Sequence, residues 1–564
     1  MPDLPNRVDV LICGGGIAGL TLALQLRQTI PDLDVVVVEK QAHPVREAAH
    51  KVGESSVEIQ AHYLRDVLGL RDHLEADQLR KFGLRMFFSE GTNDDIARRI
   101  EYGQISEAPL PSYQLDRGRL ENRLREIVTE LGVTFVDARR VGDIQLGHGE
   151  EEHTVLVEDV DGSGVVRSRW LVDATGRAGL LKRKLGLARS VDHHANAAWL
   201  RVDHAIDVET WSDDPEWRSR VDGGKRRLST NHLMGRGYWV WLIPLASGAT
   251  SIGIVAEDSA HTFDGFNTLE RALKWLDEHE PQVAAEVRDN QDRVQDFRVM
   301  RDYAYGCLQV YSEDRWCLTG EAGVSIDPLY SSGGDLMAIS NGLITDLVYR
   351  DRAGEDVAQA AVVHNQVYLV LSEIWLVAYQ NQYPVMGNAR VMVAKVIWDT
   401  AIYWAVPGLL AFHDTYRTIG ERPAVFAALQ EVWLLHARVQ RLLREWNELD
   451  DAPVEATFAD PYTLLDFIVD LHNGMAAGLS DEELDEQVVR NVELLEQLAG
   501  QLVATVAEHL AASPSAAARA QVGTWRSDPL LSAAVDRFHE RRTANPIDPA
   551  WITLGGLSTV GASS

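Results

Sequence analysis

Residues 8–19 read VDVLICGGGIAG, and this stretch decides the fold. The pattern up to Cys13 alternates and then becomes apolar, which is typical of a buried parallel strand, and Leu20–Arg27 continues at helical spacing. Val35–Val38 is a second β-branched strand, and Glu39 follows it. The order of strand, glycine turn, helix, strand and carboxylate is a complete βαβ unit, in which the GxGxxG spacing predicts a bound nucleotide.

The glycine turn has the features that a dinucleotide needs. Gly14 permits the tight turn, Gly16 lets the backbone approach a pyrophosphate, and Gly19 allows the helix to pack on the strand. The helix N-terminus offers free amides to phosphates, and a carboxylate after the second strand can accept hydrogen bonds from ribose hydroxyls. The predicted cofactor contacts in this unit are Gly14, Gly16, Ala18, Gly19, Glu39 and Lys40.

Length and composition limit the remaining possibilities. A chain of 564 residues is too long for one core, so we expect more than one domain. The net charge of −30 argues against nucleic acid or an anionic membrane as a partner. Three scattered cysteines are too few for a disulfide framework or a metal cluster, and they fit a reducing cytoplasm. No signal peptide is visible, and the apolar stretch Ala401–Phe412 is shorter than a membrane span, so we predict a buried helix there.

Strand and helix patterns divide the chain into an α/β fold with three parts. We predict a Rossmann-like FAD-binding module over 1–345, a helical domain over 346–545 that covers the active site, and a flexible tail over 546–564. An antiparallel sheet, placed at roughly 190–300, is inserted into the module and faces the substrate. Ser480–Glu483 resembles a capping box that opens a long helix to about Leu510. The segments assigned to the inserted sheet are Thr134–Ala138, Thr154–Val160, Ala197–His204, Tyr238–Pro244 and Thr250–Ala256.

Two further segments indicate FAD rather than NAD. Residues 171–177 (LVDATGR) and 316–322 (WCLTGEA) are apolar strand ends followed by small-residue turns. Both resemble motifs of the FAD-dependent monooxygenase fold, where the second sets a carboxylate near the ribityl chain and the pyrophosphate. The resemblance assigns this place to Gly320 and Glu321, although most relatives have Asp instead of Glu. Residues 114–123 (QLDRGRLENR) resemble the helix start that supplies an arginine, here Arg117, to the cofactor.

Residues 239–244 (WVWLIP) narrow the chemistry, because this hexapeptide resembles the signature of flavin-dependent halogenases. In a strand, Trp239, Trp241 and Ile243 share one face, so the two indoles form a bulky wall that ends at Pro244. In that family the wall stands beside a tunnel from the flavin and keeps substrate off the isoalloxazine. An aromatic stripe in the core of a sheet is the simpler interpretation of the same pattern.

Lys81 lies in RKFGLR (80–85), which resembles the context of the essential lysine of these halogenases. A lysine at the end of an apolar tunnel can donate a hydrogen bond to hypohalous acid, or its amine can attack that acid and form a haloamine. Desolvation would lower the pKa of the lysine and raise the neutral fraction that the second route needs. The alternative is an exposed lysine at the end of a helix or strand.

Residues 327–334 (DPLYSSGG) follow the second FAD motif, as expected for the loop under the flavin. The amides of such a turn can bind halide, and the resemblance assigns this role to Ser332 and Gly333; a flavin loop without halide is the alternative. Family members that act on free tryptophan carry Glu at the position of Tyr330, so this form is more similar to members that act on phenols and pyrroles. Residues 52–55 (VGES) resemble the loop that covers the flavin.

These resemblances imply halogenation of an electron-rich aromatic substrate, free or tethered to a carrier protein, with FADH2, oxygen and chloride or bromide. A separate flavin reductase would supply FADH2, because the chain has no second nucleotide fingerprint. Hypohalous acid would pass the tryptophans to Lys81, and Asp335 or Glu54 is a candidate base for the ring proton. Two alternatives stay open: an aromatic hydroxylase or epoxidase on the same scaffold, and a flavin-bearing scaffold protein without catalysis.

Overall fold

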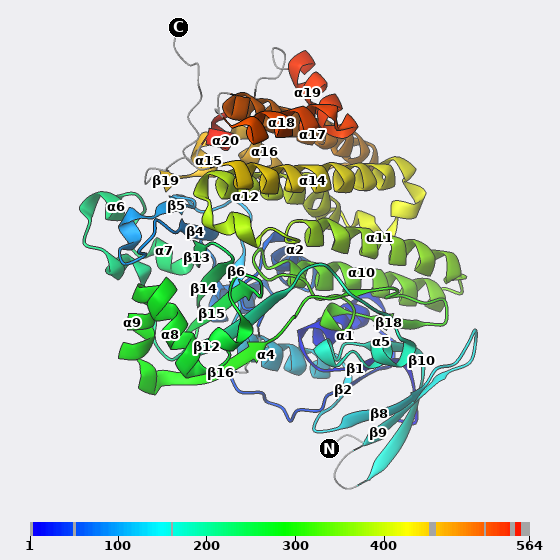
Figure 1. Ribbon diagram of the computed structural model, residues 1–564. Coiled ribbons are helices and arrows are strands. Elements are labelled where there is room, and N and C mark those ends of the chain that lie inside the picture. The colour runs from blue at the N-terminus through cyan, green and yellow to red at the C-terminus, as the bar shows by residue number, and fades with distance from the viewer. Residues whose placement is uncertain are drawn as a thin grey trace.

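The computed structural model describes residues 4–48, 52–158, 162–450, 458–511, 515–541 and 547–553. These residues form a mixed α/β structure with two large sheets and a cap of helices (Figure 1). In that view the nucleotide sheet lies at the lower right, the second sheet at the lower left, and the C-terminal helices, coloured yellow to red, above both. The predicted α/β fold class is confirmed.

The predicted βαβ unit is present. β1 (Arg7–Cys13) leads through α1 (Ile17–Thr29) to β2 (Val35–Val38), and β1 pairs in parallel with β2 and with β10 (Ser163–Asp173). β18 (Trp316–Leu318) pairs in parallel with the end of β10. Because parallel strands present their carboxyl ends at one edge, the glycine turn and the turns of both later FAD motifs meet there.

Two segments predicted for the inserted sheet belong to the nucleotide sheet instead. β7 (Thr134–Val136) pairs in parallel with β2, and β9 (His153–Glu158) joins β8 (Arg140–Gln145) and β10 in an antiparallel extension. Residues 159 and 160 of the second segment lie outside the described residues. Alternation of apolar and polar residues marks a half-exposed strand, but it does not say which antiparallel sheet the strand joins.

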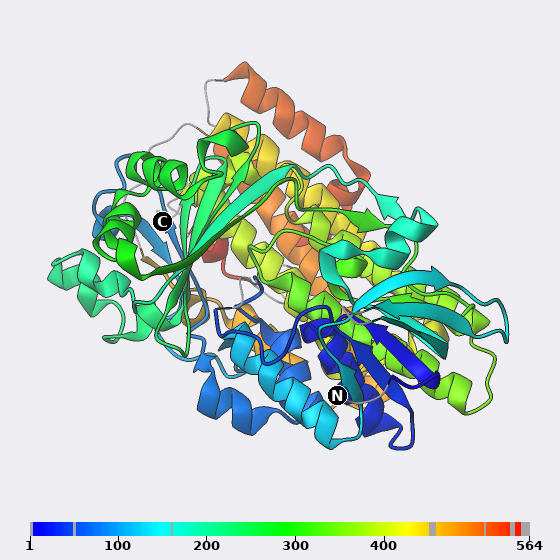
Figure 2. The same cartoon turned by 90° about the horizontal axis from the view of Figure 1, so that it is seen from below.

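The second sheet has eight strands in the order β16-β12-β15-β14-β13-β4-β5-β19, and its broad twist is visible in Figure 2. It takes strands from three parts of the chain, including one from the helical region. In chain order, the strands are β4 (Leu84–Phe88), β5 (Ile100–Tyr102), β12 (Ala195–Val202), β13 (Thr230–Gly235), β14 (Tyr238–Pro244), β15 (Thr250–Glu257), β16 (Val294–Met300) and β19 (Phe458–Ala459).

The two faces of β14 explain where the tryptophan motif points. Tyr238, Val240 and Leu242 pack in a separate apolar cluster under α8 (Leu269–His279) and α9 (Pro281–Asp289). The odd-numbered residues of the strand, which include both tryptophans, turn to the opposite face and join the main core. The wall expected from the alternation is therefore formed, and it faces the nucleotide module.

Helices dominate the described chain from residue 332 onward. The capping box at Ser480–Glu483 is confirmed, since the Ser480 amide donates to Glu483 Oε2 (2.8 Å) and the Glu483 amide donates to Ser480 Oγ (3.4 Å). The long helices are α10 (Ser332–Arg352), α11 (Ala358–Val377), α12 (Ala389–Tyr403), α14 (Pro423–Leu449), α16 (Asp466–Met475), α17 (Asp481–Ala511), α18 (Ala516–Ser527) and α19 (Pro529–Arg541).

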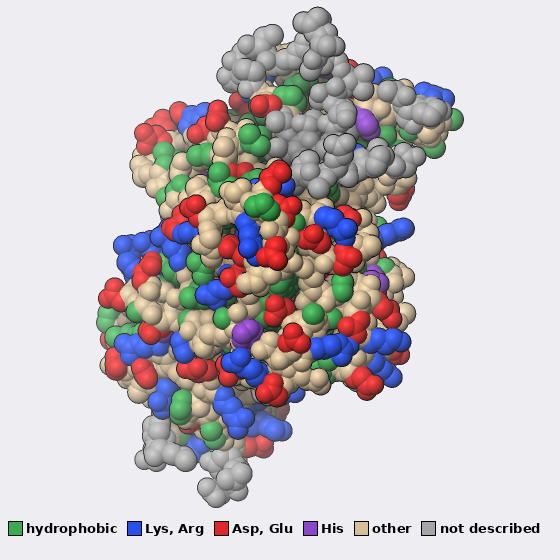
Figure 3. Space-filling model, turned by 90° about the vertical axis from the view of Figure 1, so that its left-hand side faces the viewer, with side chains coloured by type: hydrophobic (Ala, Val, Ile, Leu, Met, Phe, Trp, Pro, Cys, Tyr) green, Lys and Arg blue, Asp and Glu red, His purple; other side chains and the backbone are tan. Residues whose placement is uncertain are grey.

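Helix α11 is long and apolar enough to cross a membrane by length and composition. Half of its most apolar window is buried, however, and it packs against α10 and α14 as a core helix does. The stretch Ala401–Phe412 is largely buried, as predicted, with a π-helical turn at Trp404–Gly408. Of the predicted tail, only 547–553 is described, and it contains the short helix α20 (Ala550–Thr553). The face shown in Figure 3 carries intermixed acidic and basic side chains.

Candidate active site

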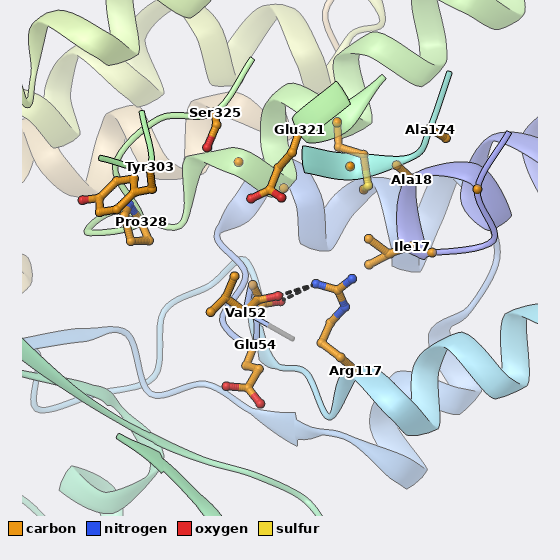
Figure 4. Close-up of a pocket in the computed structure, with 18 of the residues that line it drawn as sticks. Ile17, Ala18, Val52, Glu54, Arg117, Ala174, Tyr303, Glu321, Ser325 and Pro328 are labelled. Atoms are coloured by element: carbon orange, nitrogen blue, oxygen red, sulfur yellow. Dashed lines mark hydrogen bonds between the residues drawn. The ribbon is translucent and has the colours of Figure 1, made fainter. Parts of the chain in front are cut away.

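One cavity brings most of the sequence motifs together. Its volume is about 900 Å³, and it is lined by residues from both sheets, from the start of α10 and from segment 52–55. Figure 4 looks into it, with Arg117, Val52 and Glu54 on one side and Glu321, Ser325 and Tyr303 on the other. Of the predicted cofactor contacts, the lining includes Gly14, Gly16, Ala18, Glu39, Lys40, Arg117, Gly320 and Glu321.

The glycine turn is built for close backbone contacts. Gly14 has a φ of +112°, and a Cβ there would lie 2.3 Å from the carbonyl oxygen of Ala174. Gly19 is not in the lining, because it packs where a Cβ would lie 2.0 Å from the oxygen of Gly14. A Cβ on Gly16 would meet nothing within 4 Å, so the absent side chain leaves open space beside the N-terminus of α1.

Charged side chains flank that space. Glu39 accepts the amides of Gly15 (2.7 Å) and Gln41 (2.8 Å), so the turn itself holds its carboxylate in place. Arg117, at the start of α4 (Arg117–Glu130), donates from Nη1 to the oxygen of Val52 (2.6 Å) and from Nη2 to Glu121 (2.7 Å). These anchors fix both charges at the wall of the cavity without consuming all their hydrogen-bonding capacity.

The tryptophan wall forms another side of the cavity. Trp239, Trp241 and Ile243 line it, whereas Pro244 ends β14 as a buried residue outside the lining. The indole rings lie 5.7 Å apart between centroids. Trp239 Nε1 donates to Tyr383 Oη (3.1 Å), and Trp241 Nε1 donates to the Ser251 hydroxyl (3.1 Å). Both rings are therefore fixed by packing and by a hydrogen bond.

A buried carboxylate connects this wall to the loop at 327–334. Asp327 lines the cavity, and its Oδ2 accepts from Tyr303 (2.6 Å) and Tyr383 (2.6 Å) and lies 2.8 Å from His193 Nε2. Tyr383 is the same residue that receives the indole N–H of Trp239. Burial opposes the charge of Asp327, but these partners outweigh it and lower the pKa of the carboxyl.

The same loop ends at the N-terminus of α10, which opens onto the cavity. Ser331 has a φ of +58° and lines the cavity together with Gly333. The hydroxyl of Ser332 turns away and shares a hydrogen bond with Tyr379 (2.8 Å), so only its backbone remains available on the cavity side. Tyr330 also points away, and its hydroxyl donates to Asp399 in the helical region (2.9 Å).

Lys81 is buried, with 6% of its surface exposed, and lies behind the cavity lining rather than in it. Its Nζ donates to the Ser55 hydroxyl (2.9 Å) and to the Ser56 carbonyl (2.9 Å), and Ser55 is a lining residue. Burial lowers the pKa of Lys81 to about 8, against the opposing charges of Glu58 and Asp335. About one tenth of the amine is therefore neutral at pH 7.

A second cavity, of about 370 Å³, lies on the other side of the same segment. Residues 55–62, which we call the dividing segment, contribute to both cavities. Ser55 and Gln60 line the first, and Glu58 and His62 line the second. The alternation follows from helix α2 (Glu58–His62), where residues four apart share a face and the residue between them points elsewhere. Lys81 is thus bound to the segment that separates two cavities.

The two carboxylates predicted as candidate bases lie in different surroundings. Glu54 lines the first cavity and forms a buried ion pair with Arg201, and burial raises its pKa. Asp335 is fully buried in the first turn of α10 and accepts the amide of Gln60 (2.9 Å). Burial raises the pKa of Asp335 well above its usual value.

Sequence reasoning missed two residues beside Lys81. Glu58 is near enough for its charge to act on Lys81, and it faces the second cavity. His232 lines the first cavity opposite Trp239 (5.2 Å between ring centroids), and its Nδ1 has no hydrogen-bond partner among the described residues. Burial and the Lys81 charge lower the pKa of His232 to about 3, so the ring is neutral. His232 lies opposite Trp241 in the antiparallel pair of β13 and β14. The short connection between these two strands was the sequence signal that could have placed His232 beside the tryptophan wall.

Comparisons with known proteins agree with this geometry. Residues 7–246 match the family model described as FAD binding domain. The chain is 22% identical over 436 residues to the flavin-dependent halogenase chlA of Dictyostelium discoideum, covering 72% of this chain and 70% of that protein. It is 28% identical to the 1H-pyrrole-2-carbonyl peptidyl-carrier-protein chlorinase of Pseudomonas fluorescens, covering 58% of this chain and 72% of that protein.

The fold also matches solved structures. The halogenase PltM in complex with phloroglucinol and FAD superposes with a TM-score of 0.63 at 16% identity, covering 86% of this chain and 96% of that chain. The match therefore extends well into the helical region, beyond the FAD motifs. The chain is a flavin-dependent oxidoreductase that carries an FAD-binding domain and is homologous to the flavin-dependent halogenases.

Proposed function

We propose that this enzyme uses reduced FAD and oxygen to oxidise chloride or bromide, and that it transfers the halogen to an electron-rich aromatic ring. The observation that carries the proposal is the position of Lys81, which is buried and bound to the segment between two cavities. An oxidant made in one cavity can then be used in the other, under the control of a single amine.

The residues of the first cavity fit FAD. Open space beside Gly16 and the N-terminus of α1 suits a pyrophosphate, and the anchored carboxylate of Glu39 suits ribose hydroxyls. Arg117 and Glu321 face the cavity from opposite sides and would hold the middle of the cofactor (Figure 4). When bound in its reduced form, FAD supplies, together with oxygen, the oxidation of halide to hypohalous acid.

The chain's own residues have distinct tasks in this proposal. The first amides of α10 have no partner within the helix, and we assign the halide to those of Ser332 and Gly333. The fixed indoles of Trp239 and Trp241 keep a bulky aromatic substrate away from the isoalloxazine. The first cavity thus admits small ions, and the larger substrate binds outside it.

Lys81 is the group that touches the oxidant. A neutral amine has two N–H bonds, and the hydroxyl of Ser55 and the carbonyl of Ser56 accept two. The lone pair is then directed away from both acceptors, which leaves it free to attack hypohalous acid. Because the pKa of Lys81 is about 8, this neutral form is accessible without an added base.

Partners and location follow from the same reasoning. A separate flavin reductase delivers reduced FAD, since the described chain has one dinucleotide turn. One relative is named for a carrier-bound pyrrole and another is solved with phloroglucinol, so small electron-rich rings are the substrate class we propose. The three cysteines are buried and unpaired, which fits the reducing cytoplasm.

The test measures halide-dependent chemistry directly. The enzyme, loaded with FAD and supplied with a flavin reductase, is given bromide and monochlorodimedone, which traps hypohalous acid. We expect bromination of the trap only when bromide, oxygen and reductant are all present. Oxygenation of an aromatic probe without halide would contradict the proposal and favour a hydroxylase.

A further inference from the structure

The second cavity, which we call the chamber, has its own set of lining residues. Its walls come from α2 and the π-helical turn that follows it at Tyr63–Val67, from Leu110 and Pro111, and from the helical region near Phe412 and Met475. Pro111 precedes Ser112, whose carbonyl accepts the backbone amide of Lys81 (2.8 Å). The chamber is thus joined to Lys81 both through the dividing segment and through the backbone beside Lys81.

The lining includes aromatic and thioether side chains. His62 and Phe412 are stacked with centroids 4.2 Å apart at an interplanar angle of 16°, and Met475 adds a polarisable thioether. A volume of about 370 Å³ is near the lower end of ligand pockets, which suits a ligand of one or two rings. Glu58 and Asp66 outnumber Arg65 among the charged lining residues, so the chamber disfavours an anionic ligand.

Glu58 lines this chamber and lies beside a buried histidine. Its carboxylate Oε1 lies 3.5 Å from Nε2 of His472, which is fully buried on α16. Burial opposes the charge of Glu58, but the neighbouring His472 outweighs it and lowers the pKa of Glu58. The group is therefore an ionised acceptor at neutral pH, in contrast to Asp335, whose pKa burial raises.

We infer that the second cavity binds the aromatic substrate as a neutral phenol of one or two rings, and that Glu58 is the base that removes the ring proton. The inference rests on the proposed function, because it needs hypohalous acid at Lys81. Neither Glu54, which is paired with Arg201, nor Asp335 lines this cavity.

The chemical balance is simple. The ring carbon attacks the halogen, so a carbon–halogen bond forms and the oxygen–halogen bond breaks, with its electron pair leaving on hydroxide. With a haloamine at Lys81, hydroxide has already left as water with a proton of the amine; the nitrogen–halogen bond then breaks, and the ring proton returns through Glu58 to the Lys81 nitrogen instead of to hydroxide. The carbon–hydrogen bond then breaks, its electrons restore the aromatic ring, and the proton goes to Glu58. Glu58 passes the proton to hydroxide, so arene and hypohalous acid give haloarene and water.

The first experiment uses the FAD-loaded enzyme with reductase, bromide and 4-methylphenol as the probe. In Glu58→Gln we expect hypohalous acid to form at the wild-type rate, while bromination of 4-methylphenol falls by about 10²-fold. Ring deuteration should slow the variant and not the wild type, because proton removal becomes limiting only without the base. Glu58→Asp should recover part of the rate, and Glu130→Gln, on the exposed surface of α4, is the matched control.

The outcomes separate the two proposals. Failure of the wild-type enzyme to form hypohalous acid would contradict the proposed function. Normal hypohalous acid with unchanged 4-methylphenol bromination in Glu58→Gln would overturn the role of Glu58. Absence of any bromination of 4-methylphenol by the wild type, with hypohalous acid present, would overturn the substrate class.

A second experiment tests the chamber without catalysis. Crystals of the full chain with FAD are soaked in 4-bromophenol, and the anomalous signal of bromine locates the ring. We expect the bromine between the His62–Phe412 pair and Glu58. A bromine peak in the first cavity, or none in either, would overturn the chamber assignment.

Discussion

Two buried lysines differ in their surroundings. Lys81 binds to the dividing segment, and Lys395 lies on α12. Lys395 donates to the carbonyl of Ala378 (2.7 Å), to Asp399 Oδ2 (2.5 Å) and to Gln440 Oε1 (2.9 Å). Asp399 also accepts from the Gln440 amide (2.6 Å), which closes the network. All three ammonium protons have acceptors, and one acceptor is a carboxylate, so the charge of Lys395 is matched.

Lys81 donates only to neutral acceptors among the described residues. Its two acceptors, Ser55 and Ser56, are neutral, and the carboxylates of Glu58 and Asp335 act on it by charge without a hydrogen bond among those described. Burial lowers the pKa of Lys395 as well, but its three hydrogen bonds join α12 to its neighbours and leave no N–H free. A buried lysine with neutral partners and a pKa of about 8 keeps a lone pair for chemistry.

The largest expected effect is on aromatic halogenation in Lys81→Met. We expect hypohalous acid still to form and halogenation of 4-methylphenol to fall by about 10³-fold or more, because the group that handles the oxidant is lost. Lys81→Arg keeps a donor that stays charged, so it should fail equally if the amine must attack. Parallel assays with monochlorodimedone and the phenol measure both steps. Retained halogenation by Lys81→Met would remove Lys81 from the mechanism, whereas retention by Lys81→Arg alone would assign Lys81 the role of a charged hydrogen-bond donor.

The corresponding change at the other lysine should act on stability instead. Lys395→Met leaves the Asp399 carboxylate buried without its cation, which we expect to cost about 3–5 kcal/mol in the free energy of unfolding. Lys81→Met leaves no hydrogen-bonded carboxylate behind, so its cost should be about 1 kcal/mol. Urea unfolding of both variants measures the difference; equal costs would mean that the two lysines play the same structural part.

A smaller effect is expected from pH. If the neutral amine of Lys81 attacks hypohalous acid, halogenation should rise about tenfold per pH unit below the pKa of about 8 and level off above it. The sign follows because raising the pH removes the proton and exposes the lone pair. Single-turnover rates with added hypobromous acid between pH 6 and 9 measure this. A rate that falls above pH 8 would instead assign Lys81 the role of a charged hydrogen-bond donor.

The parts of the site that the sequence could predict are local ones. The glycine turn, the capping box at Ser480 and the odd-numbered face of β14 each depend on residues a few positions apart, where spacing fixes geometry. The homology of the FAD motifs adds contacts from Arg117 and Glu321, which the cavity lining brings together.

The parts that could not be predicted depend on distant partners. The pKa of Glu58 is lowered by His472, which is more than 400 residues further along the chain. The pKa of Asp327 is lowered by partners that include His193 and Tyr383. No periodicity encodes such pairs, because only the tertiary fold brings them together. The same limit explains why the alternation at β9 did not reveal which sheet it joins.

The smallest expected effect compares one neutral partner at each lysine. Ser55→Ala removes one acceptor from Lys81, so the amine loses part of its orientation, and we expect halogenation to fall by about tenfold, equivalent to about 1.4 kcal/mol. Gln440→Met removes an acceptor from Lys395 and a donor from Asp399, which should cost about 2 kcal/mol in stability and leave halogenation unchanged. Both variants are measured by phenol bromination and by urea unfolding, so that each change is tested for its effect on activity and on stability. If Gln440→Met lowered halogenation at unchanged stability, the paired lysine would not be merely structural, because the network reaches the active-site loop through Tyr330 and Asp399.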